Sequence, residues 1–60
     1  MRYKANDKVK HIKTNLTGRV VASEDTNPEG KIIVECRVID NGNIGYQILT
    51  ELPSDFQLIE

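Results

Sequence analysis

A run of alternating apolar and polar residues from Lys31 to Ile39 limits the folds that this chain can adopt. In an extended chain, one face of this run would carry Ile32, Val34, Cys36 and Val38. The other face would carry Lys31, Glu35 and Arg37. A period of two is typical of a strand buried on one side, whereas a helix has a period of about 3.6. The run therefore predicts a β-strand with one face in a core.

A hairpin is predicted to follow this strand. Asn41 and Gly42 come next, and both residue types tolerate the positive φ that a type I′ turn requires. Apolar residues then alternate again along the return strand at Ile44, Tyr46 and Ile48. The two runs should therefore pair as neighbouring antiparallel strands.

Turn signals divide the rest of the chain at short intervals. They lie at Asn15 to Gly18, Asn27-Pro28-Glu29-Gly30, Asn41-Gly42-Asn43 and Pro53-Ser54-Asp55. Short strands at this spacing, without a helical apolar stripe, predict an all-β fold. The length of 60 residues leaves room for one domain, over residues 1–60, with a thin core. Such small domains often gain stability by association.

Another strand is predicted from Gly18 to Ser23. Its two faces would carry Val20 with Ala22 and Arg19 with Val21. This alternation again indicates a strand with one apolar face, although Val21 makes the outer face less polar than in the longer run.

Residues 8–13 fit two alternative strand patterns. Val9 is in phase with His11, whereas Ile12 is in phase with Lys10. A bulge, or an edge position in the sheet, would reconcile the two patterns. Because His11 lies among lysines, we expect it at the surface or half-buried.

The segment after residue 51 resembles part of a known family. Leu52-Pro53-Ser54-Asp55-Phe56-Gln57-Leu58-Ile59 is similar to the Pro-Ser-Asn-Tyr-Val segment of Src-homology-3 domains, which forms a one-turn 3₁₀ helix and a final strand. The resemblance implies a small five-stranded SH3-like barrel with a short 3₁₀ turn before the last strand. That turn would span Leu52 to Asp55, and the strand would carry Phe56, Leu58 and Ile59.

The same resemblance does not extend to the peptide-binding groove of that family. Src-homology-3 domains bind proline-rich peptides in an aromatic groove that includes a Trp. This chain has no Trp and only three aromatic residues, Tyr3, Tyr46 and Phe56. We therefore do not expect recognition of proline-rich peptides.

A second resemblance is to the plasmid-borne type II dihydrofolate reductases, tetramers of small barrels around one pore where folate and the nicotinamide cofactor meet. Similar residues occur in the same order at Asp7-Lys8-Val9-Lys10, Gly18-Arg19-Val20-Val21, Thr26-Asn27, Pro28-Glu29-Gly30, Val34-Glu35, Gln47-Ile48 and Leu58-Glu60. The pore strand Val-Gln-Ile-Tyr matches residues 46–49, so Gln47 and Ile48 carry over. Leu49 replaces the pore Tyr, and His11 matches the pore Lys. The resemblance implies a barrel that associates. Reductase activity is an alternative, although two polar groups that hold the ligands in that family are missing from this chain.

Charge is divided unevenly along the chain, although the formal net charge is only −1. Residues 1–20 hold six Lys or Arg and one Asp, which gives +5, and residues 21–60 hold two against eight carboxylates, which gives −6. The basic part could contact nucleic-acid phosphates through Lys8, Lys10, Lys13 and Arg19. Alternatively, the first and last strands of the barrel are neighbours and the two sets of charges neutralise each other.

Residues suited to catalysis or metal binding are scarce. His11 is the only histidine, and no Ser or Cys signature accompanies it, so no nucleophilic triad is predicted. One His and one Cys cannot form a structural zinc site within one chain. Cys36 lies in the apolar run and is expected as a buried, reduced thiol without a disulfide. We therefore predict no enzyme activity, no cofactor and no metal.

The sequence favours a small non-catalytic binding module in the cytoplasm that acts through a protein partner or forms a homo-oligomer. No apolar stretch approaches the roughly 20 residues that span a bilayer, so no membrane partner is expected. Nucleic-acid binding is the alternative. Function tends to concentrate in loops and exposed residues, here the 15–18 and 24–29 loops and Tyr46. The predicted binding residues are Lys8, Lys10, Lys13, Leu16, Arg19, Tyr46 and Gln47.

Overall fold

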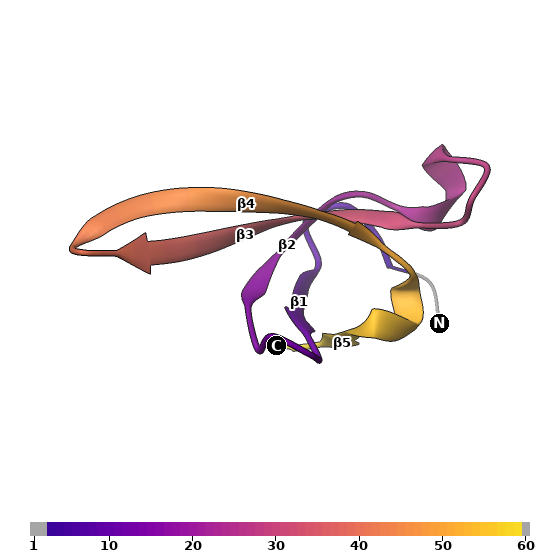
Figure 1. The fold of residues 1–60 in the computed structure, drawn as a ribbon. Coiled ribbons are helices and arrows are strands. Elements are labelled where there is room, and N and C mark those ends of the chain that lie inside the picture. Colours follow the sequence, from indigo (N-terminus) through magenta and orange to yellow (C-terminus); the bar gives the residue numbers. More distant parts are fainter. Residues whose placement is uncertain (1–2, 60) are drawn as a thin grey trace.

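Five strands form one antiparallel sheet. The computed structural model describes residues 3–59. Its strands are β1 (Lys8–His11), β2 (Thr17–Ala22), β3 (Ile32–Asp40), β4 (Asn43–Glu51) and β5 (Phe56–Leu58). Two 3₁₀ turns, η1 (Glu24–Thr26) and η2 (Pro53–Asp55), precede β3 and β5 (Figure 1). The predicted all-β class, with five strands and a 3₁₀ turn before the last, is confirmed.

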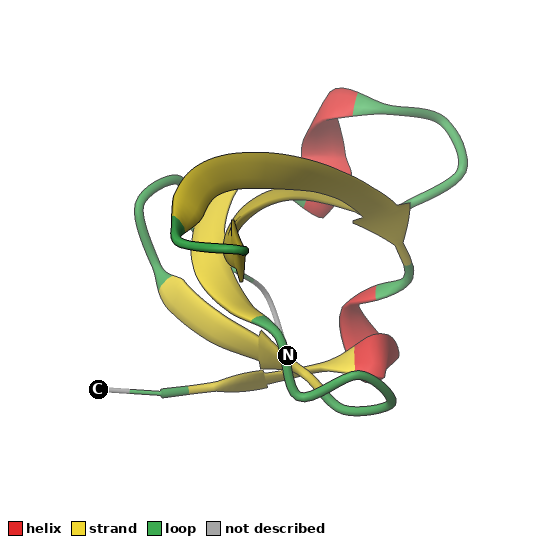
Figure 2. Ribbon diagram, turned by 60° about the vertical axis from the view of Figure 1, so that its left-hand side comes forward, coloured by secondary structure: helices red, strands yellow, loops and turns green. Residues whose placement is uncertain are grey.

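The sheet is curled but open. The strand order is β4-β3-β2-β1-β5, and each neighbouring pair is antiparallel. Figure 2 shows the strands bending round towards a barrel shape. Within residues 3–59 no ladder joins β4 to β5, so these strands are the two edges of the sheet. The first and last strands are neighbours, as predicted, with Val9 opposite Leu58. Arg2 and Glu60, which enter the charge balance, lie outside the described residues.

The core lies on the inner face of the curled sheet. Its buried apolar residues are Tyr3, Val9, Val20, Ile32, Val34, Cys36 and Phe56. Leu16 and Leu49 are partly buried and pack against it. The predicted facing of β3 is therefore confirmed over its first half, because Val34 and Cys36 have no exposed surface whereas Arg37 is exposed.

The ambiguity of residues 8–13 is resolved in favour of Val9 and His11. Both are buried, and Ile12 is 54% exposed. The expectation that His11 is at the surface or half-buried is wrong, because only 4% of this residue is exposed. The cause is the pairing of β1 with β5, which puts His11 opposite Phe56 on the inner face. β1 is thus an inner strand, and the irregular register lies in β2 between Val20 and Ala22.

The hairpin of β3 and β4 extends beyond the rest of the molecule. Asn41 has φ 50° and Gly42 has φ 80°, which confirms the predicted type I′ turn. The β2–β3 ladder ends at the pair Gly18↔Cys36, so β3 and β4 pair only with each other beyond this point. We call residues 37–46 the arm and the other described residues the body. The arm projects to one side in Figure 1 and gives the molecule dimensions of 37 × 19 × 19 Å.

Candidate functional site

A row of exposed apolar side chains follows the outer face of the β3–β4 hairpin, along the arm and on to Ile48 just beyond it. Residues that are opposite in an antiparallel ladder share a face, and the register pairs Ile39 with Ile44, Arg37 with Tyr46 and Glu35 with Ile48. The row, which we call the outer stripe, consists of Ile39 (69% exposed), Ile44 (62%), Tyr46 (64%) and Ile48 (56%). These four residues are contiguous in space and lie side by side on two paired strands.

The backbone of β4 is free along its outer edge. In an antiparallel ladder, hydrogen-bonded pairs alternate with non-hydrogen-bonded pairs. The two-residue turn makes Asp40↔Asn43 the first hydrogen-bonded pair, so the odd-numbered residues of β4 bond to β3. The N–H and C=O groups of the even-numbered residues 44–50 therefore point away from β3. No other strand of the described chain pairs with this side of β4, which we call the β4 edge.

A groove of about 470 Å³ lies on the outer face between the body and the arm. It is lined by Lys8, Thr17, Gly18, Arg19, Glu35, Arg37, Tyr46 and Ile59. The ladders explain this grouping, because Lys8 pairs with Arg19, which pairs with Glu35 on the next strand. Three cations and one carboxylate therefore surround an exposed phenol ring. An anionic chain that also presents a flat ring would suit this groove.

The groove brings together three of the predicted binding residues: Lys8, Arg19 and Tyr46. Lys10 lies next to it, opposite Thr17, and is half-buried. Arg37 and Glu35 were not predicted as site residues. The alternating run does place both residues on the outer face of the strand. The sequence does not, however, give the strand register that puts Arg37 beside Tyr46.

The other three predicted residues lie outside the groove. Lys13 is exposed in the turn after β1. Leu16 is half-buried and packs against the core, so it covers the core rather than standing free as an anchor. Gln47 is exposed on the opposite face of the hairpin, where its partner in the ladder is the buried Cys36. The structure therefore does not bring these three residues together.

His11 has a structural environment inside the body. Its Nδ1 atom is 2.8 Å from the Thr14 hydroxyl, and its Nε2 atom is 3.1 Å from a carboxylate oxygen of Glu51. Its ring lies edge-on to Phe56, with 5.1 Å between centroids. Nδ1 thus holds the turn after β1, whereas Nε2 joins β1 to the end of β4, so both nitrogens of the buried imidazole ring have a partner.

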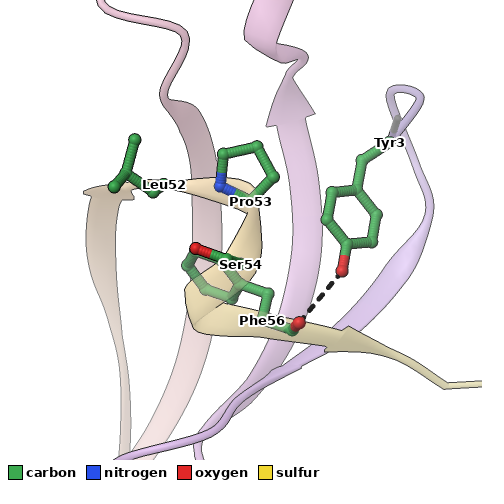
Figure 3. A pocket seen from close by; sticks show the side chains of 5 residues that line it. All are labelled: Tyr3, Leu52, Pro53, Ser54 and Phe56. Atoms are coloured by element: carbon green, nitrogen blue, oxygen red, sulfur yellow. Dashed lines mark hydrogen bonds between the residues drawn. The ribbon is translucent and has the colours of Figure 1, made fainter. Parts of the chain in front are cut away.

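A second hollow, of about 430 Å³, lies beside η2 (Figure 3). It is lined by Tyr3, Leu52, Pro53, Ser54 and Phe56. The Tyr3 hydroxyl donates a hydrogen bond of 3.1 Å to the Phe56 carbonyl, which ties the start of the chain to β5. Burial raises the pKa of Tyr3, and the carboxylates of Glu24 and Asp7 raise it further. The Tyr3 hydroxyl thus has a structural role, through its buried hydrogen bond to Phe56.

Features for metal binding or thiol chemistry are weak in the described chain. Among residues 3–59, no three His, Cys, Asp or Glu side chains come close enough to hold a metal ion. Burial raises the pKa of the Cys36 thiol, which disfavours the nucleophilic thiolate. In the same residues, no helix has the length and apolar character needed to cross a membrane.

Two surfaces thus stand out: the outer stripe with the β4 edge, and the groove with its three cations. No protein-family model matches the chain, and no curated protein or solved structure matches it either. The resemblances to Src-homology-3 domains and to type II dihydrofolate reductases therefore remain predictions from the sequence.

Proposed function

We propose that this protein is a small non-catalytic binding module that acts through protein–protein contact, using the outer stripe and the β4 edge. The observation that carries the proposal is the exposure of four large apolar side chains in contiguous positions. Exposed apolar patches that are continuous, rather than scattered, commonly mark interaction sites. Full burial of one such side chain stabilises a complex by roughly 1.5–3 kcal/mol before the costs of association.

The β4 edge adds backbone hydrogen bonds to this surface. Natural proteins usually protect edge strands with Lys, Pro or a covering segment, because a free edge pairs readily with other strands. Residues 43–50 contain neither charge nor proline. An added strand would bond to the backbone of β4 and place alternate side chains against the outer stripe. This mode needs no catalytic group, in agreement with the proposed class of function.

The strand order and η2 support the finer assignment of the fold to the Src-homology-3-like barrels. The five strands follow one another as a meander that returns β5 to β1, and η2 comes directly before β5. The segment that resembles that family, Leu52 to Ile59, covers η2 and β5.

Nucleic-acid binding is the second candidate, because Lys8, Arg19 and Arg37 surround Tyr46 in one groove. Single strands bind to basic grooves by phosphate contacts and by stacking of bases on aromatic rings. Three phosphate contacts would give a slope of about −2 when the logarithm of affinity is plotted against the logarithm of salt concentration.

Two double variants on the same outer face separate the candidates. The stripe variant combines Ile44→Thr and Ile48→Thr, which keeps β-branched residues, and the groove variant combines Arg19→Gln and Arg37→Gln. Tagged proteins would be used to capture partners from cells and to titrate a labelled single-stranded oligonucleotide at low and physiological salt. We expect the stripe variant to lose its protein partners, including its own copies, and the groove variant to keep them.

The opposite result would overturn the proposal. If the groove variant loses a salt-dependent oligonucleotide complex while the stripe variant changes no protein contact, the nucleic-acid candidate replaces it. Circular dichroism of both variants provides the folding control, because all four substitutions lie at outward positions.

A further inference from the structure

The three residues of the outer stripe on β4 also belong to the β4 edge. Ile44, Tyr46 and Ile48 present their side chains on the outer face and direct their free backbone groups away from β3. A strand that pairs with β4 must itself have unpaired backbone N–H and C=O groups at every second residue. A second β4 meets this requirement, because its own free groups lie at the same alternate positions.

We infer that the occupant of the β4 edge is β4 of a second copy, paired antiparallel around a two-fold axis at Gln47. The inference rests on the proposed function and names its partner. With the axis at Gln47, the free backbone groups of residues 44–50 on both copies overlap completely. Tyr46 would then lie opposite Ile48 of the second copy, and Ile44 would lie opposite Thr50. A two-fold interface of this kind is isologous, so one surface serves both partners.

In this arrangement the outer faces of the two copies lie on the same side of the joined sheet. Opposite residues in an antiparallel ladder point to the same side, and the axis is perpendicular to the sheet. The outer stripes of both copies would therefore meet on one side and form a continuous apolar row. Any extended strand has free backbone groups at alternate residues, but a second copy carries them on the same residues as its apolar outer-stripe side chains, so the two apolar rows meet by symmetry.

The charges of β4 are compatible with self-pairing. Residues 43–50 hold no charge, and the one carboxylate of β4 is Glu51 at its end. In the proposed register Glu51 lies opposite the Asn43 amide of the second copy, which can donate a hydrogen bond to a carboxylate. Like charges would therefore not oppose each other across the new ladder. The tip of each arm would also reach the end of the other β4, where Leu52 is 47% exposed.

The solution mass gives the first test. Light scattering of the full chain at micromolar concentration should give twice the mass of one chain, with little dependence on salt, because the contact is apolar and backbone-mediated. The stripe variant, Ile44→Thr with Ile48→Thr, should shift this equilibrium towards the monomer.

A cysteine scan tests the register. In a Cys36→Ala background, which removes the thiol opposite residue 47 in the β3–β4 ladder, Gln47→Cys should form an intermolecular disulfide under mild oxidation. Non-hydrogen-bonded partners on the axis have Cα atoms about 4.5 Å apart, which is within the range for a disulfide. Gly45→Cys is the matched control. Its side chain has room, since the nearest atom to a Cβ there is Val38 Cγ2 at 3.7 Å. The two-fold axis would place its two copies about 13 Å apart along the strands, so no disulfide should form. The wild type, with Cys36 buried, should also remain uncross-linked.

Three outcomes would overturn the inference. A monomer without cross-linking, combined with loss of captured partners in the stripe variant, would mean that another protein occupies the edge; the proposed function would then stand. A dimer in which Gln47→Cys does not cross-link would mean a different interface. A monomer whose captured partners are unaffected by the stripe variant would remove both the inference and the proposed function.

Discussion

The two halves of β3 have the same alternating pattern but different environments. In the body, Val34 and Cys36 have no exposed surface, whereas Ile39 in the arm is 69% exposed. The body half lies between β2 and β4 and covers a core, but the arm half pairs only with β4. Alternation therefore predicts a strand and its two faces, while burial requires a second layer that the local pattern does not supply.

The same contrast divides structural and functional roles. The body is held by ladders, by the core and by the buried contacts of His11 and Tyr3. The arm is held by one ladder and by the Asn41-Gly42 turn. Regions with few buried apolar contacts unfold locally at a lower cost in free energy than the core does. The arm can therefore present apolar side chains to a partner without weakening the body.

The largest expected difference comes from an Asp placed in each half of β3. Val34→Asp should abolish folding, because an unpaired charge in the core costs several kcal/mol and a chain of this size has a total stability of only about 3–9 kcal/mol. Ile39→Asp should cost less than about 1 kcal/mol, which is the scale of one cross-strand contact. Thermal melts followed by circular dichroism would measure both. Equal losses would show that the arm is packed in solution.

The elements that the sequence predicted well are those with local signals. The facing of Val34, the Asn41-Gly42 turn and the helical turn before Phe56 each depend on residues within a few positions. The burial of His11 was missed for the opposite reason. The local sequence fits two alternation patterns for residues 8–13 equally well. The pattern that buries His11 is determined by Phe56, which pairs with His11 from 45 positions away in the sequence.

The groove was predicted only in part for the same physical reason. The basic residues Lys8 and Arg19 and the exposed Tyr46 could be recognised singly by their type and phase. Their convergence with Arg37 depends on the registers of three ladders, which no local pattern specifies. Likewise, a leucine in a polar loop can be an exposed anchor or a cap on the core, and only the tertiary packing of Leu16 distinguishes the two.

A second comparison uses one glycine from each region. In Gly18→Ala, the added methyl group would collide with the Glu35 carbonyl oxygen and lie 2.9 Å from Cys36 Sγ, so we expect a loss of about 1–3 kcal/mol. In Gly45→Ala, the nearest atom is Val38 Cγ2 at 3.7 Å, and the smaller entropy of the unfolded chain should make this variant up to about 1 kcal/mol more stable. Urea unfolding would show opposite signs. The same sign for both would contradict the close packing of β2 on β3.

An alkaline titration tests the body through Tyr3. Its pKa is raised by burial and then by Glu24 and Asp7, so the folded state holds the proton more tightly than the unfolded state. This contribution is complete below the unfolded pKa of about 10 and is lost as pH rises through the higher folded value. Tyr3→Phe should cost about 1 kcal/mol at neutral pH through its lost hydrogen bond, and its stability should decline less steeply above pH 10. Cys36, whose pKa burial also raises, is present in both proteins. Parallel curves would contradict the assignment.

The smallest effect is expected for Glu35→Lys, beside the core residue Val34 but on the outer face. Its neighbours in the ladders are Arg19 and Ile48, so the new Lys would face a like charge across one pair at a cost of a few tenths of a kcal/mol. The thermal midpoint should therefore scarcely change, in contrast to Val34→Asp one position earlier. A reversal of these two effects would mean that the facing of β3 is wrong by one residue, because such a shift exchanges the two faces of a strand. The substitution also replaces the carboxylate of the groove with a fourth cation. If nucleic acid is the ligand, oligonucleotide affinity should rise at low salt; if protein contact through the outer stripe is the function, self-association should remain as in the wild type.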